Sequence, residues 1–197
     1  MEQYGNIFEV RHNGLRPQKG SILISEPFLR GVHFQHAVVL LVEHNMHGSM
    51  GLVLNKRTEL RVNDLFPELK SLPDIPVYLG GPVGANHLYF LHTLGGRVPG
   101  SMPIEGDLCF DGDFEVIKSY ILDRNPVEGH VKFFLGYSGW TENQLNGEIL
   151  GDSWLVSTPT AGRIMCDGGD ALWKDAVRSL GSPYDTWTNY PVYPDMN

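Results

Sequence analysis

Short apolar runs, separated by glycine, proline and polar residues, dominate the hydrophobic pattern of this chain. Runs of this length, rich in β-branched and aromatic residues, are typical of strands that are buried in a sheet. We therefore expect strands at residues 22–25, 37–43, 51–54, 77–79, 88–92, 108–110 and 130–135.

Apolar residues recur at helical spacing in fewer places, and we expect helices at residues 62–69, 113–123 and 170–180. Pro67 interrupts the first helix, and Pro126 follows the end of the second. Asp170 is the expected N-cap of the third, which Gly181 ends. Because strands come in neighbouring groups with helices inserted unevenly, the pattern indicates an α+β fold and disfavours a doubly wound nucleotide-binding fold.

The most informative segment follows the last predicted strand and has the sequence GYSGWTENQLNGE. Gly136 and Gly139 predict a sharp turn, because glycine adopts positive φ or lets another backbone approach closely. Thr141 and Gln144 fit a capping box, in which each side chain bonds the backbone N–H of the other residue. The box predicts a short helix over residues 142–148.

Ser138 lies in this segment between the predicted strand and helix, as the serine of a nucleophile elbow does. The residue order differs from G-x-S-x-G, because glycine follows Ser138 directly and Trp140 stands where the second glycine is required. A turn serine beside a packed Trp140 is the favoured interpretation, and a nucleophilic serine is the alternative.

Four segments occur in an order that points to a known family: GSILISEP at 20–27, GSMGLVLN at 48–55, LGGPV at 79–83 and LGYSGW at 135–140. With these, the chain resembles the bacterial AlgH/YqgE family, whose function is largely unknown and which has been described as regulating transcription. The resemblance implies a strongly bent mixed β-sheet, curled into a partly closed pseudo-barrel with short helices packed outside. In the family pattern alanine often occupies the position of Ser138, which argues against a serine nucleophile.

The length and composition of the chain indicate a single domain over residues 1–197. Hydrophobic residues make up 42% and charged residues 19%, which is ordinary for a globular protein, and no linker divides the chain. We expect an N-terminal arm at 1–19 and an aromatic, proline-rich tail at 182–197. The tail carries four aromatic residues spaced by three, Tyr184, Trp187, Tyr190 and Tyr193. This spacing predicts a polyproline II segment that packs its rings against its own chain or against a partner protein.

The net charge of −8 disfavours direct binding of nucleic acid, since a polyanion is repelled unless basic residues gather on one face. The densest basic cluster is Lys56, Arg57 and Arg61, for which a solvated loop is the favoured interpretation and an anion site the alternative. No helix-turn-helix or zinc-finger pattern is present in the sequence.

Residues 37–42 form the longest apolar run, which is far too short to span a membrane. The first residues carry no export signal, so we expect a cytoplasmic protein without membrane association. Cys109 and Cys166 are then expected as free thiols, because their pairing cannot be assumed in a reducing compartment.

Histidine and acidic residues do not predict a metal, a cofactor or a catalytic pair. Two histidine pairs, His33 with His36 and His44 with His47, flank one predicted strand about 20 Å long, so they are too far apart to share an ion. The polar residues most embedded in predicted structure are Glu43, His92 and Glu148. Their spacing does not form an acid-base dyad, and Glu148 is expected to end a helix or accept a hydrogen bond from the glycine segment.

Paired glycines also follow the predicted strand at 77–79, where tight backbone approach is the favoured interpretation and an anion-binding turn the alternative. If this segment neighbours the one at 136–140, a groove between them is the best candidate ligand site. Its predicted members are Asn55, Gly80, Gly81, Tyr137, Ser138, Trp140 and Gln144.

The sequence thus predicts a cytoplasmic, non-enzymatic regulatory or ligand-binding protein that uses no cofactor and acts with an unknown protein or small-molecule partner. The alternative is an enzyme. It would be a small hydrolase that uses the segment 136–140, or a thiol-dependent enzyme that uses Cys109 or Cys166.

Overall fold

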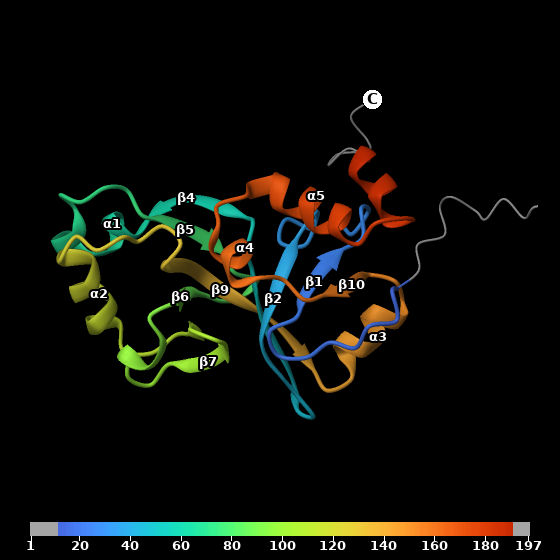
Figure 1. The fold of residues 1–197 in the computed structure, drawn as a ribbon, viewed down its shortest axis with the longest axis horizontal. Coiled ribbons are helices and arrows are strands. Elements are labelled where there is room, and N and C mark those ends of the chain that lie inside the picture. The colour runs from blue at the N-terminus through green and yellow to red at the C-terminus, as the bar shows by residue number, and fades with distance from the viewer. Residues whose placement is uncertain (1–11, 191–197) are drawn as a thin grey trace, which may run out of the picture.

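Ten strands and five α-helices make up the computed structural model, which describes residues 12–190 (Figure 1). The strands are β1 Ile22–Ser25, β2 Val38–Asn45, β3 Gly48–Val53, β4 Arg57–Arg61, β5 Pro76–Leu79, β6 Val83–His92, β7 Met102–Glu105, β8 Leu108–Phe110, β9 Val131–Thr141 and β10 Trp154–Ser157. The α-helices are α1 Val62–Leu65, α2 Phe114–Leu122, α3 Gln144–Leu150, α4 Ala161–Met165 and α5 Gly169–Ser179. Three short 3-10 helices are η1 Pro67–Leu69, η2 Gly95–Arg97 and η3 Tyr184–Asn189.

The strands form one mixed sheet in the order β10-β1-β2-β3-β9-β6-β8-β7, with β5 beside β9 and β4 beside β5. Within residues 12–190 the pair β5–β9 is parallel and the other pairs are antiparallel. The predicted α+β class is confirmed. The described strands do not close on themselves, so the pseudo-barrel is not confirmed.

Strand β9 joins the two halves of the sheet and crosses the middle of the molecule (Figure 1). Residues 131–135 pair with β5 and β6, whereas residues 138–141 pair with β3. The sharp turn predicted at Gly136 is therefore wrong. Gly136 does adopt a positive φ of 70°, but the chain continues as strand because the next residues find a new partner in β3.

Both faces of the sheet are covered where β1, β2 and β10 meet. Val38 and Leu40 face a core cluster that contains Trp173 of α5, whereas Val39 and Leu41 face a cluster that contains residues of α3. Burial on both faces explains why β2 is a continuous apolar run instead of an alternating one. Three strands that the sequence did not predict, β4, β7 and β10, lack such a long run.

Helix α2 covers the other half of the sheet and confirms the helix predicted at 113–123. The Asp113 side chain accepts a hydrogen bond from the Glu115 N–H at 2.9 Å, which caps the helix. Ile117 and Ile121 are buried against β9, in a cluster that includes Phe133. The helix predicted at 62–69 is instead divided at Phe66 into α1 and η1, as the proline that follows requires.

Two predicted helix starts are corrected. Helix α3 begins at Gln144, and its N-cap Asn143 is left-handed with φ 60°. Half of the predicted capping box forms, because the Thr141 N–H donates to Gln144 Oε1 at 3.0 Å, but the Thr141 hydroxyl donates to the same oxygen instead of accepting from the Gln144 amide. In α5 the N-cap is Gly168, and Asp170 lies within the first turn.

The chain after α5 forms a 3-10 helix over Tyr184–Asn189, so the polyproline II prediction is wrong there. Both conformations have three residues per turn, which is why the spacing did not separate them. Trp187 is buried in the core cluster beside α5, and Tyr190 contacts Phe28 edge-on at 5.0 Å. Tyr193 lies outside the described residues, as do residues 1–11 of the predicted N-terminal arm.

No helix within residues 12–190 combines the length and the hydrophobicity that crossing a membrane requires.

Candidate functional site

The two glycine segments lie directly against each other, in a contact that we call the glycine seam: Gly80, Gly81, Gly136 and the backbone of Tyr137. The Gly80 N–H donates to the Leu135 carbonyl at 2.9 Å. A Cβ atom added at Gly80 would overlap the Gly136 carbonyl oxygen, and one at Gly81 would overlap the Tyr137 backbone. The glycines therefore allow two backbones to approach where any side chain would separate them.

Asn55 and Ser138, two predicted ligand residues, are both buried, and Ser138 contacts the seam. Asn55 accepts a hydrogen bond from the Val38 N–H at 2.9 Å and donates to the His36 carbonyl at 2.8 Å. The Ser138 side chain is fully buried in β9, and its hydroxyl donates to the Gly80 carbonyl at 3.2 Å. These bonds give both residues a structural role, and the strand environment of Ser138 is not that of a nucleophile elbow.

Trp140 and Gln144, also predicted ligand residues, are both linked to Glu148. One Glu148 oxygen accepts the indole N–H groups of Trp140 and Trp154, each at 2.8 Å, and the other accepts the Gln144 amide at 3.0 Å. The expectation that Glu148 accepts a hydrogen bond from this segment is confirmed. Of the predicted set, Tyr137 and Trp140 line a shared open depression of about 520 Å³. The ligand site at the glycine segments otherwise stays a prediction.

A larger cavity, of about 640 Å³, lies at the amino ends of the parallel strands β5 and β9. Apolar residues supply much of its lining, among them Ile75, Pro76, Ile121, Val127 and Met165. Polar groups enter it at Tyr78 on β5, Lys132 on β9 and Asp167 after α4, and the charged side chains Arg57, Asp74, Arg124 and Glu128 also line it. We call it the lysine cavity.

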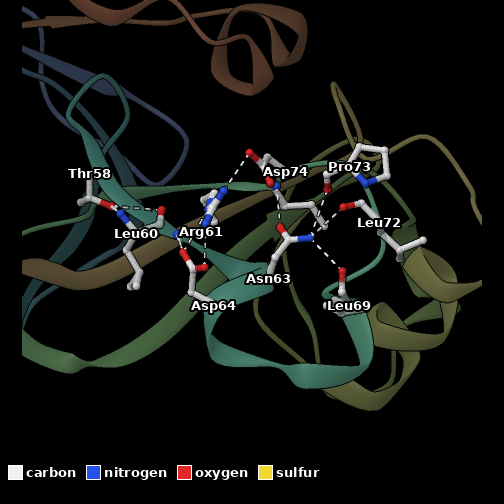
Figure 2. Close-up of polar contacts among 10 residues, drawn as sticks. Thr58, Leu60, Arg61, Asn63, Asp64, Leu69, Leu72, Pro73 and Asp74 are labelled. Carbon is white, nitrogen blue, oxygen red and sulfur yellow. Dashed lines mark hydrogen bonds and ion pairs between the residues drawn. The ribbon is translucent and has the colours of Figure 1, made fainter.

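Asn63 holds the first wall of the lysine cavity, the segment 69–75 that leads into β5. Its amide donates to the carbonyls of Leu69 at 2.8 Å and of Leu72 and Pro73 at 3.2 Å, while its oxygen accepts the Ile75 N–H at 2.8 Å (Figure 2). One buried amide thus fixes the path of the whole segment.

Helix α2 supports the second wall, the segment 124–129 that leads into β9. The Tyr120 hydroxyl donates to the Pro126 carbonyl at 2.8 Å, and the Asn125 side chain donates to the Tyr120 carbonyl at 3.0 Å. The third wall follows α4, where Arg57 pairs with Asp167 at 3.1 Å. Each wall therefore has polar contacts of its own, which preorganises the cavity.

Lys132 is the chemically distinctive residue of this cavity. Its side chain is almost fully buried, with 4% exposed. Its ammonium donates to the Cys166 carbonyl at 2.7 Å and to the Ile164 carbonyl at 3.4 Å, and lies 4.2 Å from the centre of the Tyr78 ring. Burial lowers the pKa of this ammonium to about 8, against the smaller opposing effects of Cys166 and Asp167. Burial also raises the pKa of the Tyr78 phenol.

The basic cluster predicted from the sequence is neutralised by carboxylates. Lys56 lies 3.9 Å from Asp170, and Arg61 pairs with both Asp64 and Asp74 (Figure 2). Since Arg57 also has a carboxylate partner, the cluster offers no concentrated positive patch for a polyanion. This arrangement argues further against direct binding of nucleic acid.

Cysteine and histidine residues are placed separately. Cys109 is buried in β8, whereas Cys166 is exposed and its thiol donates to the Arg163 carbonyl at 3.0 Å. His36 is stacked on Trp173 at 3.9 Å, away from His44, which contacts Ser49. Within residues 12–190, no three His, Cys, Asp or Glu side chains are grouped to hold a metal ion.

Lys132 is not among the site residues predicted from the sequence. The available signal was a lysine inside the apolar run VKFFL, since lysine is rarely buried without a specific partner. Asn63 and Tyr78 gave no comparable signal, because the role of Asn63 depends on the path of the loop that follows it and that of Tyr78 on a residue distant in sequence.

Comparison with known proteins identifies the family. The model of a family described as AlgH-like matches residues 22–185. A UPF0301 protein of Parabacteroides distasonis is 54% identical over 198 residues, covering 100% of both chains, and one of Bacteroides fragilis is 46% identical, covering 98% of this chain and 97% of the relative.

Among solved structures, the AlgH protein of Pseudomonas aeruginosa has a TM-score of 0.69 at 27% identity, covering 88% of this chain and 94% of that one. A Corynebacterium diphtheriae protein has a TM-score of 0.74 at 20% identity, covering 89% and 94%, which supports the fold alone. The chain belongs to the AlgH-like family of UPF0301 proteins.

Proposed function

We propose that this protein is a cytoplasmic, non-enzymatic regulator that acts by binding a small ligand in the lysine cavity. The observation that carries the proposal is the cavity itself. Its volume of about 640 Å³ falls within the range of small-molecule sites, and its lining combines apolar surface with a few polar groups. Walls that are held independently reduce the entropy lost when a ligand binds.

The placement of the candidate nucleophiles favours binding over catalysis. Ser138 and Cys109 are buried, and the Ser138 hydroxyl donates to a backbone carbonyl instead of facing a cavity. Cys166 is the exposed thiol of the two and adjoins the lysine cavity through its carbonyl contact with Lys132. The thiol alternative therefore predicts fast alkylation of Cys166 near neutral pH, whereas a binding protein needs no such reactivity.

A screen of small metabolites by thermal shift tests the proposal. We expect at least one compound class to raise the melting temperature, because a ligand that binds the folded state stabilises it. In Val127→Trp, an indole should fill part of the cavity and abolish this shift. Val32→Trp is the matched control, since Val32 is 79% exposed and lies outside the cavity lining. Equal shifts in both variants would place the ligand elsewhere and contradict the proposal.

A further inference from the structure

The Lys132 ammonium is a buried charge that is not neutralised by a carboxylate. The ion pairs among the described residues do not include Lys132, and Asp167, the carboxylate that acts on its pKa, is already paired with Arg57. The ammonium has three N–H groups, and two carbonyls accept hydrogen bonds from it. One N–H group is therefore left to donate to a ligand. A buried charge of this kind is costly until an opposite charge reaches it.

The surroundings of Lys132 restrict what that opposite charge can belong to. Apolar side chains, including Ile75, Val127 and Met165, line the same cavity and favour a hydrocarbon body. Arg57 is paired with Asp167, and Asp74 at the cavity is paired with Arg61. Arg124 and Glu128 lie exposed at the cavity, where water screens their charges. One buried positive charge is therefore available, which suits a ligand with a single acidic group.

From these contacts we infer that the lysine cavity binds an organic monoanion, with its acid group on Lys132 Nζ and its hydrocarbon part on the apolar lining. This inference rests on the proposed function and specifies its ligand class. It assigns Lys132 as the anchoring residue, with the Tyr78 ring and the Cys166 carbonyl holding the ammonium in place.

A matched series of octanoate, 1-octanol and octylamine tests the inference by calorimetric titration. The three probes share a hydrocarbon chain and differ in the charge of the head group. We expect octanoate to bind at least about tenfold more tightly than octanol, and octylamine to bind most weakly. In Lys132→Met the preference for octanoate should disappear, while Lys19→Met, which changes an exposed lysine outside the cavity, should retain it.

If Lys132→Met fails to fold, the pH dependence of octanoate binding by the wild type tests the inference instead. Octanoate affinity should fall by about tenfold per pH unit between pH 8 and 9.5, as the free ammonium loses its proton, while octanol affinity stays constant. The charged or titratable groups that share the cavity with Lys132 are Arg57, Asp74, Tyr78, Arg124, Glu128 and Asp167, and Cys166 adjoins it.

Equal binding of octanol and octanoate by the wild type would overturn the inference but retain a ligand cavity. The same conclusion follows if Lys132→Met keeps the full preference for octanoate. Absence of octanoate binding would also overturn it, and the metabolite screen with Val127→Trp would still decide the proposed function separately.

Discussion

The glycine seam and the lysine cavity lie along the same strand, β9, but the seam is closely packed and the cavity is open. At Gly136 the backbones of two segments touch, and no room is left for a single Cβ atom. Five residues earlier, the strand begins beside a cavity of about 640 Å³ that contains a buried charge. The segment with the most distinctive sequence therefore sets the shape of the sheet, whereas the proposed ligand site lies where the sequence is less distinctive.

Alanine at the seam should have the largest effect of any single substitution considered. Gly81 has φ 156°, and a Cβ atom there would overlap the Tyr137 backbone, which cannot move without breaking β9. We expect Gly81→Ala to lower the free energy of unfolding by more than about 4 kcal/mol, measured by urea denaturation with tryptophan fluorescence.

Gly147→Ala provides the matched control for this substitution. Gly147 lies inside α3, and an added Cβ atom would meet nothing within 4 Å. Because alanine has the higher helix propensity, this variant should be more stable by up to about 1 kcal/mol. Similar stability of the two alanine variants would show that the seam is not tightly packed.

Glu148 links α3 to Trp140 of β9 and Trp154 of β10, and its loss should give the next largest effect. Glu148→Ala leaves the buried indole N–H groups of Trp140 and Trp154 without their acceptor. At 1–3 kcal/mol for each unsatisfied donor, we expect a loss of about 4 kcal/mol in the free energy of unfolding. Glu142→Ala, at an exposed position before the same helix, should change it by less than about 0.5 kcal/mol. A loss below 1 kcal/mol for Glu148→Ala would mean that water replaces the carboxylate.

The lysine cavity predicts a pH effect that the seam does not share. The pKa of Lys132 is about 8 in the folded protein and near 10.5 in the unfolded chain, so the buried charge lowers stability at every pH below about 8. Between pH 8 and 10.5 the unfolded chain binds more protons, and the wild type should gain about 3 kcal/mol relative to Lys132→Met. Urea denaturation of both proteins at pH 7.5, 9 and 10 measures this difference. Parallel profiles would show that the ammonium is not desolvated.

Local pattern was sufficient to predict the longer buried elements, but not the short strand β10, which is buried on both faces of the sheet. The apolar run of β2 and the spacing of α2 each carry their signal within a few residues. The glycine pattern gave a wrong prediction at Gly136, because a positive φ is equally compatible with a turn and with a kink inside a strand. Only the partner strand β3, distant in sequence, decides between them.

The candidate sites differ in predictability for the same reason. The contact between Gly80 and Gly136 could be anticipated because paired glycines usually mark close approach. The lysine cavity forms where segments 69–75, 124–129 and 165–167 pack around the same space. Each segment is held by hydrogen bonds that the spacing of residues in the sequence does not predict. A lysine within an apolar run was the one local sign of it, and that sign gives neither the walls nor the volume.

Ser138→Ala should have the smallest effect, and it separates the structural and catalytic interpretations of the seam. The Gly80 carbonyl that accepts the Ser138 hydroxyl also accepts the Val53 N–H at 2.9 Å, so it stays satisfied when the hydroxyl is removed. We expect a loss of at most about 1 kcal/mol in the free energy of unfolding. A fluorophosphonate probe, which labels activated serines, should leave Ser138 unmodified in the wild type because the side chain is fully buried. Labelling that Ser138→Ala abolishes would instead establish a reactive serine, and the seam would then have to open for it to react.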